Sequence, residues 1–69
     1  MYYGGMLKIE LAQLYLPDTQ PYLARRKLNM WITLNEELLG ELRRRGYQSK
    51  APMLTAGQVE VIMKYLGEP

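Results

Sequence analysis

The chain lacks the two side chains on which many small catalytic and metal sites depend. None of its 69 residues is histidine or cysteine, so imidazole and thiolate groups are excluded as bases, nucleophiles or metal ligands. The remaining acid–base groups are carboxylates, lysines and tyrosines, and carboxylates cluster only at Glu36, Glu37 and Glu41. The helix dipole explains Glu36 and Glu37, which begin a predicted helix, and pairing with Arg45 explains Glu41. We expect no enzyme activity, no metal and no cofactor.

The positively charged side chains are a stronger chemical signal, because they gather in the middle of the chain. Residues 25–50 hold seven lysines and arginines against three glutamates, whereas the remainder holds two lysines against four acids. The central cations are Arg25, Arg26, Lys27, Arg43, Arg44, Arg45 and Lys50. A basic centre between acidic ends favours an anionic partner, and nucleic acid is the commonest partner of that kind.

Arg25–Lys27 have two open interpretations. They lie in the first half of a predicted helix, where the helix dipole does not stabilise cations, so a partner is one explanation and a solvated surface is the other. Arg43–Arg45 need no partner, because the end of a helix stabilises positive charge. The nucleic-acid contacts that we predict are Arg25, Arg26, Lys27, Asn29 and Lys50.

The segment Pro21–Ile32 positions most of these residues. Its apolar side chains recur at the spacing of one helical face, so we expect that side to be core, with Trp31 as its largest element. The opposite side carries Arg25, Arg26 and Asn29, which we expect to point outward. The apolar side comprises Ala24, Leu28, Trp31 and Ile32.

A shorter helix is predicted before this segment. The pattern of Leu7–Leu16 is amphipathic with Lys8 on its outer side, and Pro17 ends the helix because the residue before a proline disfavours helical geometry. We expect Asp18 or Thr19 to cap the helix that follows. Two helices joined by about four residues form a corner of the helix-turn-helix type.

Two further helices are predicted by their end signals. Asn35 is a good cap for the third helix, and Gly46 suits the left-handed position at its end. Tyr47–Leu54 is too short and proline-marked for a helix, so we expect a loop or a small hairpin there. Thr55 and Gln58 form the capping-box pattern that starts the last helix.

We therefore expect one mainly α domain over residues 1–69. It would have four short helices in a helix-turn-helix-like arrangement, an extended lead over residues 1–6 and a wing-like segment before the last helix. No apolar run reaches the ~18 residues of a membrane span, and the N-terminus lacks the build of a signal peptide, so we expect a cytoplasmic protein without membrane contact. The core of so short a chain is marginal, which leaves a homo-oligomer possible.

The order of the sequence motifs resembles a short bacterial family of domains of unknown function. The shared motifs are ELAQLYLPD, NMWI, GYQSK and LTAGQVEVIMKYLGEP, and the match spans roughly Glu10–Pro69. More distantly, the chain is similar to excisionase-like winged helix-turn-helix domains. That similarity implies that Pro21–Ile32 is a recognition helix for a major groove and that Tyr47–Leu54 is the wing.

Two functional hypotheses remain open. The first is a non-enzymatic DNA-binding accessory or regulatory protein, in which Arg25, Arg26 and Asn29 face bases and phosphates. In this hypothesis Lys27 and Lys50 contact the backbone, and Arg43–Arg45 are left open as further backbone contacts. The second is a protein–protein interaction module or small homo-oligomer that uses a surplus of apolar side chains. Its interface would consist of Tyr22, Met30 and Leu34.

Overall fold

The computed structural model describes residues 5–69, so residues 1–4 of the predicted N-terminal lead lie outside the described part. Within it the fold is mainly α, as the sequence predicts. The elements in chain order are β1 (Met6–Leu7), α1 (Lys8–Tyr15), α2 (Pro21–Leu34), α3 (Glu36–Arg44), β2 (Met53–Leu54) and α4 (Ala56–Leu66).

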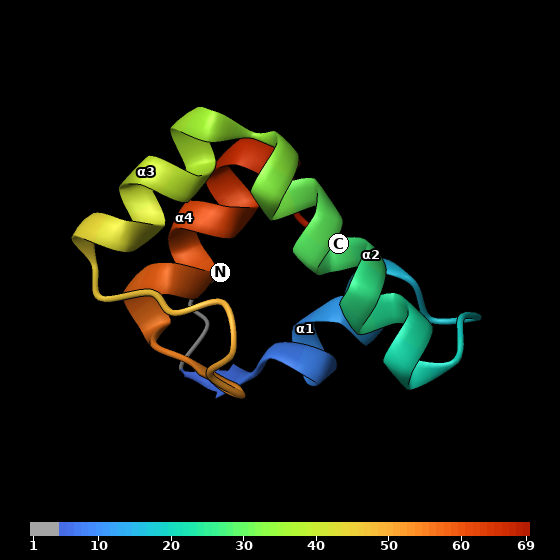
Figure 1. Ribbon diagram of the computed structural model, residues 1–69. Coiled ribbons are helices and arrows are strands. Elements are labelled where there is room, and N and C mark those ends of the chain that lie inside the picture. The colour runs from blue at the N-terminus through green and yellow to red at the C-terminus, as the bar shows by residue number, and fades with distance from the viewer. Residues whose placement is uncertain (1–4) are drawn as a thin grey trace.

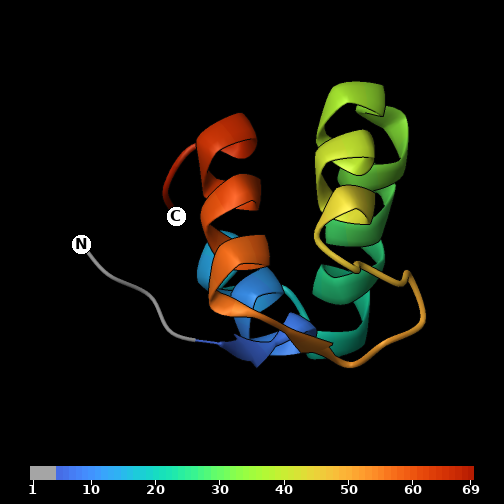
Figure 2. The same ribbon diagram turned by 90° about the vertical axis from the view of Figure 1, so that its left-hand side faces the viewer.

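The helices enclose one core between two sides of the molecule. Each of α1, α2 and α3 packs against the next helix in the chain. Figure 2 shows α4 on one side, with α2, α3 and the loop over residues 45–52 on the other. In Figure 1 the same loop runs from the end of α3 down to the sheet. The segments that carry the central cations therefore lie opposite α4, and the end of α3 reaches it, where the Gln58 side chain donates to the Arg45 carbonyl at 2.9 Å.

The two strands join distant parts of the chain. They pair in antiparallel fashion, with Met6 opposite Leu54 and Leu7 opposite Met53. Of the two forms predicted for Tyr47–Leu54, the structure has a loop up to residue 52 and then β2, whose partner is β1. The sheet therefore fixes the start of α1 beside the start of α4.

Local end signals give the right starting points for α3 and α4. The Asn35 Oδ1 accepts from the backbone N–H of Leu38 at 3.1 Å. At α4 the Thr55 Oγ1 accepts from the Gln58 N–H at 3.2 Å, and the Gln58 Oε1 accepts from the Thr55 N–H at 3.0 Å. These are the cap and the capping box that the sequence predicts.

The start of α2 differs from the prediction. Its N-cap is Gln20, which makes no side-chain capping bond, so the expected cap by Asp18 or Thr19 is wrong. Pro21 occupies the first turn, where the missing N–H has no intrahelical partner to lose, and its ring fixes a helical φ. Proline geometry starts this helix without a side-chain cap.

Trp31 lies at the edge of the core instead of its centre. Ala24, Leu28 and Ile32 are fully or almost fully buried, whereas Trp31 is only partly buried. Its ring makes a T-shaped contact with the ring of Tyr15, with centroids 6.2 Å apart. The core centre of α2 is therefore aliphatic, and the aromatic pair covers one margin.

Candidate nucleic-acid interface

The predicted contact residues on α2 do not share one side of the helix. Successive helical residues turn by about 100°, so Arg25 and Asn29 lie on one flank while Lys27 points nearly opposite to Arg25. Arg26 and Lys27 are exposed, but Arg25 and Asn29 are only half-exposed. The expectation that these two point freely outward is wrong, because the first turn of α1 and the loop after α3 pack along their flank.

The side chain that joins this flank to the loop is Lys8. Its relative exposure is 0%, and its ammonium donates three hydrogen bonds. The acceptors are Asn29 Oδ1 at 3.0 Å, Tyr47 Oη at 2.8 Å and the Ser49 carbonyl at 2.9 Å. The ammonium also lies 4.6 Å from the centroid of the Tyr47 ring. One buried cation thus connects α1, α2 and the loop.

The prediction that Lys8 points outward is therefore wrong, and the sequence held a signal against it. Lys8 stands three and four residues before Leu11 and Ala12, which are both fully buried, so it shares their helical face. Its backbone N–H donates to the Pro52 carbonyl at 2.8 Å, which fixes the first turn of α1 beside the loop. The residue type suggested an exposed side chain, whereas the helical spacing from Leu11 and Ala12 indicated a buried one.

The surroundings of Lys8 are polar but carry no negative charge. All three of its acceptors are neutral oxygens, so the ammonium is hydrogen-bonded without being neutralised. Burial, together with a smaller effect of the nearby Arg25 guanidinium, lowers the pKa of Lys8 from 10.5 to about 8. Burial also raises the pKa of the Tyr47 hydroxyl, with a smaller opposing effect of Arg25.

The end of α3 delivers Tyr47 to this cluster. Gly46 adopts φ +78°, its N–H donates to the Arg43 carbonyl, and the Tyr47 N–H donates to the Leu42 carbonyl at 2.9 Å. This is the Schellman pattern, which reverses the chain and turns the residue after the glycine toward the helix. It carries the phenol inward and leads the loop, with Lys50, toward the Asn29 flank of α2.

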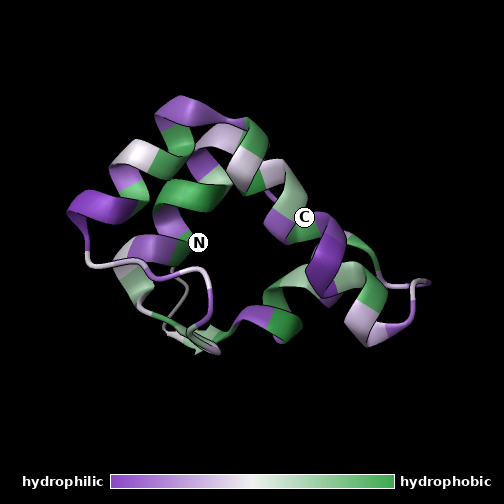
Figure 3. Cartoon of the chain, viewed as in Figure 1, coloured by the Kyte–Doolittle hydropathy of each residue, from purple (hydrophilic) through white to green (hydrophobic). Residues whose placement is uncertain are grey.

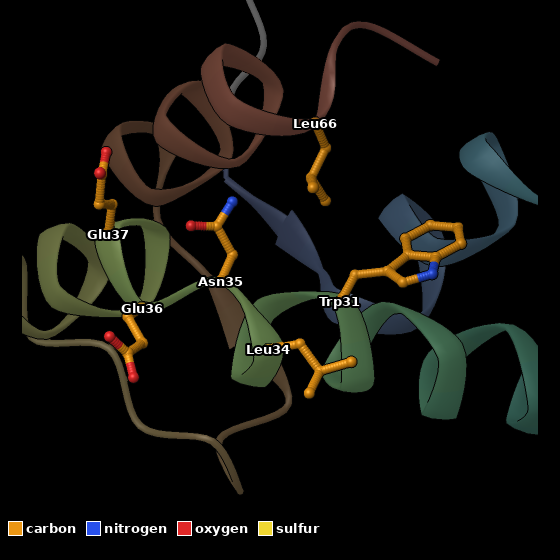
Figure 4. A pocket seen from close by; sticks show the side chains of 6 residues that line it. All are labelled: Trp31, Leu34, Asn35, Glu36, Glu37 and Leu66. Atoms are coloured by element: carbon orange, nitrogen blue, oxygen red, sulfur yellow. The ribbon is translucent and has the colours of Figure 1, made fainter.

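Within residues 5–69, three hollows that border α2 differ in charge. One of about 260 Å³ lies on the loop flank and includes Arg25 and Pro52 in its lining. A second, of about 400 Å³, follows the outer face and includes Arg26. The third, of about 580 Å³, lies on the other flank between α2, α3 and α4, and its six lining residues are Trp31, Leu34, Asn35, Glu36, Glu37 and Leu66 (Figure 4).

The two flanks of α2 are therefore opposite in electrostatic character. The loop flank and outer face have arginines in their hollows, whereas the third hollow has two glutamates and no lysine or arginine in its lining. In Figure 3 the strongly hydrophilic stretches include the first half of α2 and the far end of α3. An anion approaching α2 would be drawn to the loop flank and repelled from the third hollow.

The structure brings together some of the predicted residues and separates others. Arg25 and Asn29 adjoin the loop that contains Lys50, and Arg26 borders the same side. Lys27 turns toward the opposite side of α2. The end of α3, with Arg43–Arg45, lies across the molecule from the first half of α2 in Figure 1. The sequence analysis did not predict Lys8 as part of the site.

Comparison with known proteins gives one match. The model of the domain-of-unknown-function family DUF4248 matches residues 3–69 of the chain. The chain belongs to DUF4248. No curated protein and no solved structure matches it. Membership of DUF4248 confirms the resemblance to a family of unknown function.

Metal binding and membrane crossing both require features that can be checked in residues 5–69 of this DUF4248 domain. Within residues 5–69, no group of three or more acids lies close enough together to hold a metal ion. None of the helices in that same range combines the length and apolarity that crossing a membrane requires.

Proposed function

We propose that this DUF4248 domain binds DNA as a non-enzymatic accessory or regulatory protein, in the manner of excisionase-like winged helix-turn-helix domains. Helix α2 would enter the major groove, and the loop over residues 47–52 would contact the backbone as a wing. The observation that carries the proposal is the Lys8 cluster. By bonding to Asn29 and to the Ser49 carbonyl, it holds the loop beside the basic half of α2.

The charge distribution supports the same assignment of roles. Arg26 and Lys50 are exposed on the side where α2 and the loop meet, and both suit phosphate contact. Asn29 was expected from the sequence to contact DNA, but its amide oxygen already accepts from the Lys8 ammonium. It would help to position the loop, while Arg25 and Arg26 would make the contacts from α2.

The test is fluorescence anisotropy with a mixed pool of duplexes, beginning at low salt. If about four cations reach phosphates, log affinity should fall against log salt with a slope of roughly −4. The double variant Arg26→Ala with Lys50→Ala should flatten that slope by up to about 2. Its melting temperature should stay near that of the wild type, because both side chains are exposed.

A matched control removes the same charge elsewhere. Arg43→Ala with Lys64→Ala also deletes two exposed cations, one at the end of α3 and one on α4. This control should retain most of the affinity and nearly the full salt slope. Absence of salt-sensitive binding at tens of micromolar protein, or equal losses in both double variants, would remove the DNA proposal.

An exposed apolar row on α2 favours the second candidate, an interaction module or homo-oligomer. Tyr22 is 69%, Met30 54% and Leu34 75% exposed. These values are high for large apolar side chains on one face of a helix. Sedimentation should then detect a dimer or larger species that Met30→Glu dissociates, and a wild-type monomer at all concentrations would reject a homo-oligomer.

A further inference from the structure

The Arg25 guanidinium is a cation that lacks a partner within the described residues. Its Nε is inaccessible to solvent and has no hydrogen-bond acceptor. The single salt bridge found within residues 5–69 joins Arg44 to Glu41, so it leaves Arg25 unpaired. A guanidinium has five N–H donors, and leaving a buried one unsatisfied is unfavourable. The Arg25 guanidinium therefore has hydrogen-bonding capacity that the described residues do not satisfy.

The surroundings of Arg25 offer space for that acceptor. The hollow of about 260 Å³ lies between β1, the first turn of α1, the first half of α2 and the end of the loop. Its lining is otherwise uncharged: Leu7, Ile9, Tyr22 and Pro52 accompany Arg25. The nearby acid of α1, Glu10, is engaged at 2.9 Å by the backbone N–H of Leu7. An external anion would therefore meet no carboxylate in the lining.

The Lys8 ammonium is a second positive charge close to Arg25. Asn29 follows Arg25 by one helical turn on the same flank of α2, and it accepts from the Lys8 ammonium. That ammonium is bonded only to neutral oxygens, and Arg25 repels its charged form. Two close cations without a counter-charge destabilise the folded chain, and an anion at the hollow would relieve both at once.

We propose that the hollow at Arg25 is a seat for a phosphate group, with the Arg25 guanidinium as donor and the Lys8 ammonium as the adjoining positive charge. Guanidinium and phosphate match in geometry and charge, which favours phosphate over a simple halide. The phosphate could belong to a nucleic-acid backbone or be free in solution. The inference rests on the proposed function only if the phosphate belongs to a nucleic-acid backbone.

The first arm of the test uses inorganic phosphate at constant ionic strength, with chloride as the replaced anion. Phosphate at tens of millimolar should raise the melting temperature of the wild type by several degrees near saturation. It should do the same for Arg43→Gln, which removes an exposed arginine, but not for Arg25→Gln. In ¹⁵N NMR of the wild type, the Arg25 Nε–H resonance should shift on titration, which gives a readout independent of any variant's folding.

The second arm uses the duplex pool and separates the two sources. If backbone phosphate occupies the seat, Arg25→Gln should lower the salt slope by about 1 and weaken duplex binding about tenfold, while Arg43→Gln should not. Phosphate binding without duplex binding would support the seat and reject the proposed function. An unchanged melting temperature and Arg25 resonance in phosphate, with equal duplex binding by wild type and Arg25→Gln, would overturn the seat and leave the proposed function standing.

Discussion

Raising the pH should stabilise this domain because of Lys8. The folded chain holds the Lys8 pKa at about 8, whereas the ordinary value is 10.5. Between those values the unfolded chain keeps a proton that the folded chain has released, so stability increases as the pH rises. From about pH 7 to about pH 9.5, the two pKa values correspond to a gain of at most about 2 kcal/mol. Water that reaches the ammonium when the loop opens would reduce this figure.

The Tyr47 hydroxyl sets the upper limit of that window. Its pKa is raised by burial, so above about pH 10 the unfolded chain loses the phenolic proton more readily than the folded chain does. The contribution of Tyr47 to stability is therefore lost as the pH rises through its folded pKa. The gain from Lys8 should therefore level off above about pH 10, where the loss from Tyr47 begins to oppose it.

The assay is urea unfolding followed by circular dichroism at about pH 7 and about pH 9.5, for the wild type and Lys8→Met. Methionine has a similar length and cannot titrate, so the difference between the two pH responses isolates Lys8. Equal responses in the two proteins would refute the reasoning. If Lys8→Met does not fold, NMR titration of the Lys8 side chain in the wild type decides the matter, and a midpoint near 10.5 would contradict a buried ammonium.

Three further stability predictions follow from individual positions. Gly40→Ala should stabilise the domain by up to about 1 kcal/mol in thermal melts, because a β-carbon there meets nothing within 4 Å; a lower melting temperature would contradict this. Thr55→Ala should lower stability by about 1 kcal/mol through loss of the capping box, and an unchanged midpoint would show that the box contributes nothing. Leu28→Ala should cost about 2–5 kcal/mol and exceed Trp31→Ala, since Leu28 is fully buried and Trp31 is not; the reverse order in urea unfolding would place Trp31 in the core.

The parts of the fold that local chemistry determines could be predicted from the sequence. Asn35 and Thr55 cap helices by accepting from backbone N–H groups three residues further on. Gly46 ends a helix through its own positive φ angle. Such signals do not depend on the rest of the structure. The same reasoning failed at the start of α2, where Pro21 is sufficient without a side-chain cap.

The candidate site was harder to predict because its geometry depends on tertiary packing. Arg25 and Asn29 lie on a flank that an isolated helix would expose, and it is the loop after α3 that makes this flank half-buried. Lys8 is buried because the pairing of β1 with β2 holds the first turn of α1 beside the loop. The helical periodicity of the sequence contains no information about that strand register. Residue types showed a basic surface, but not which cations would share it.

The hydrogen bonds of Lys8 also bear on how the domain folds. They span 21, 39 and 41 residues of the chain, so they cannot form until α1, α2 and the end of α3 have come together. Contacts that close such long loops are made late, after their entropy has been lost. We therefore expect Lys8 to govern the rate of unfolding and to leave the rate of folding almost unchanged. A chevron plot in which Lys8→Met moved only the folding limb would contradict this order of events.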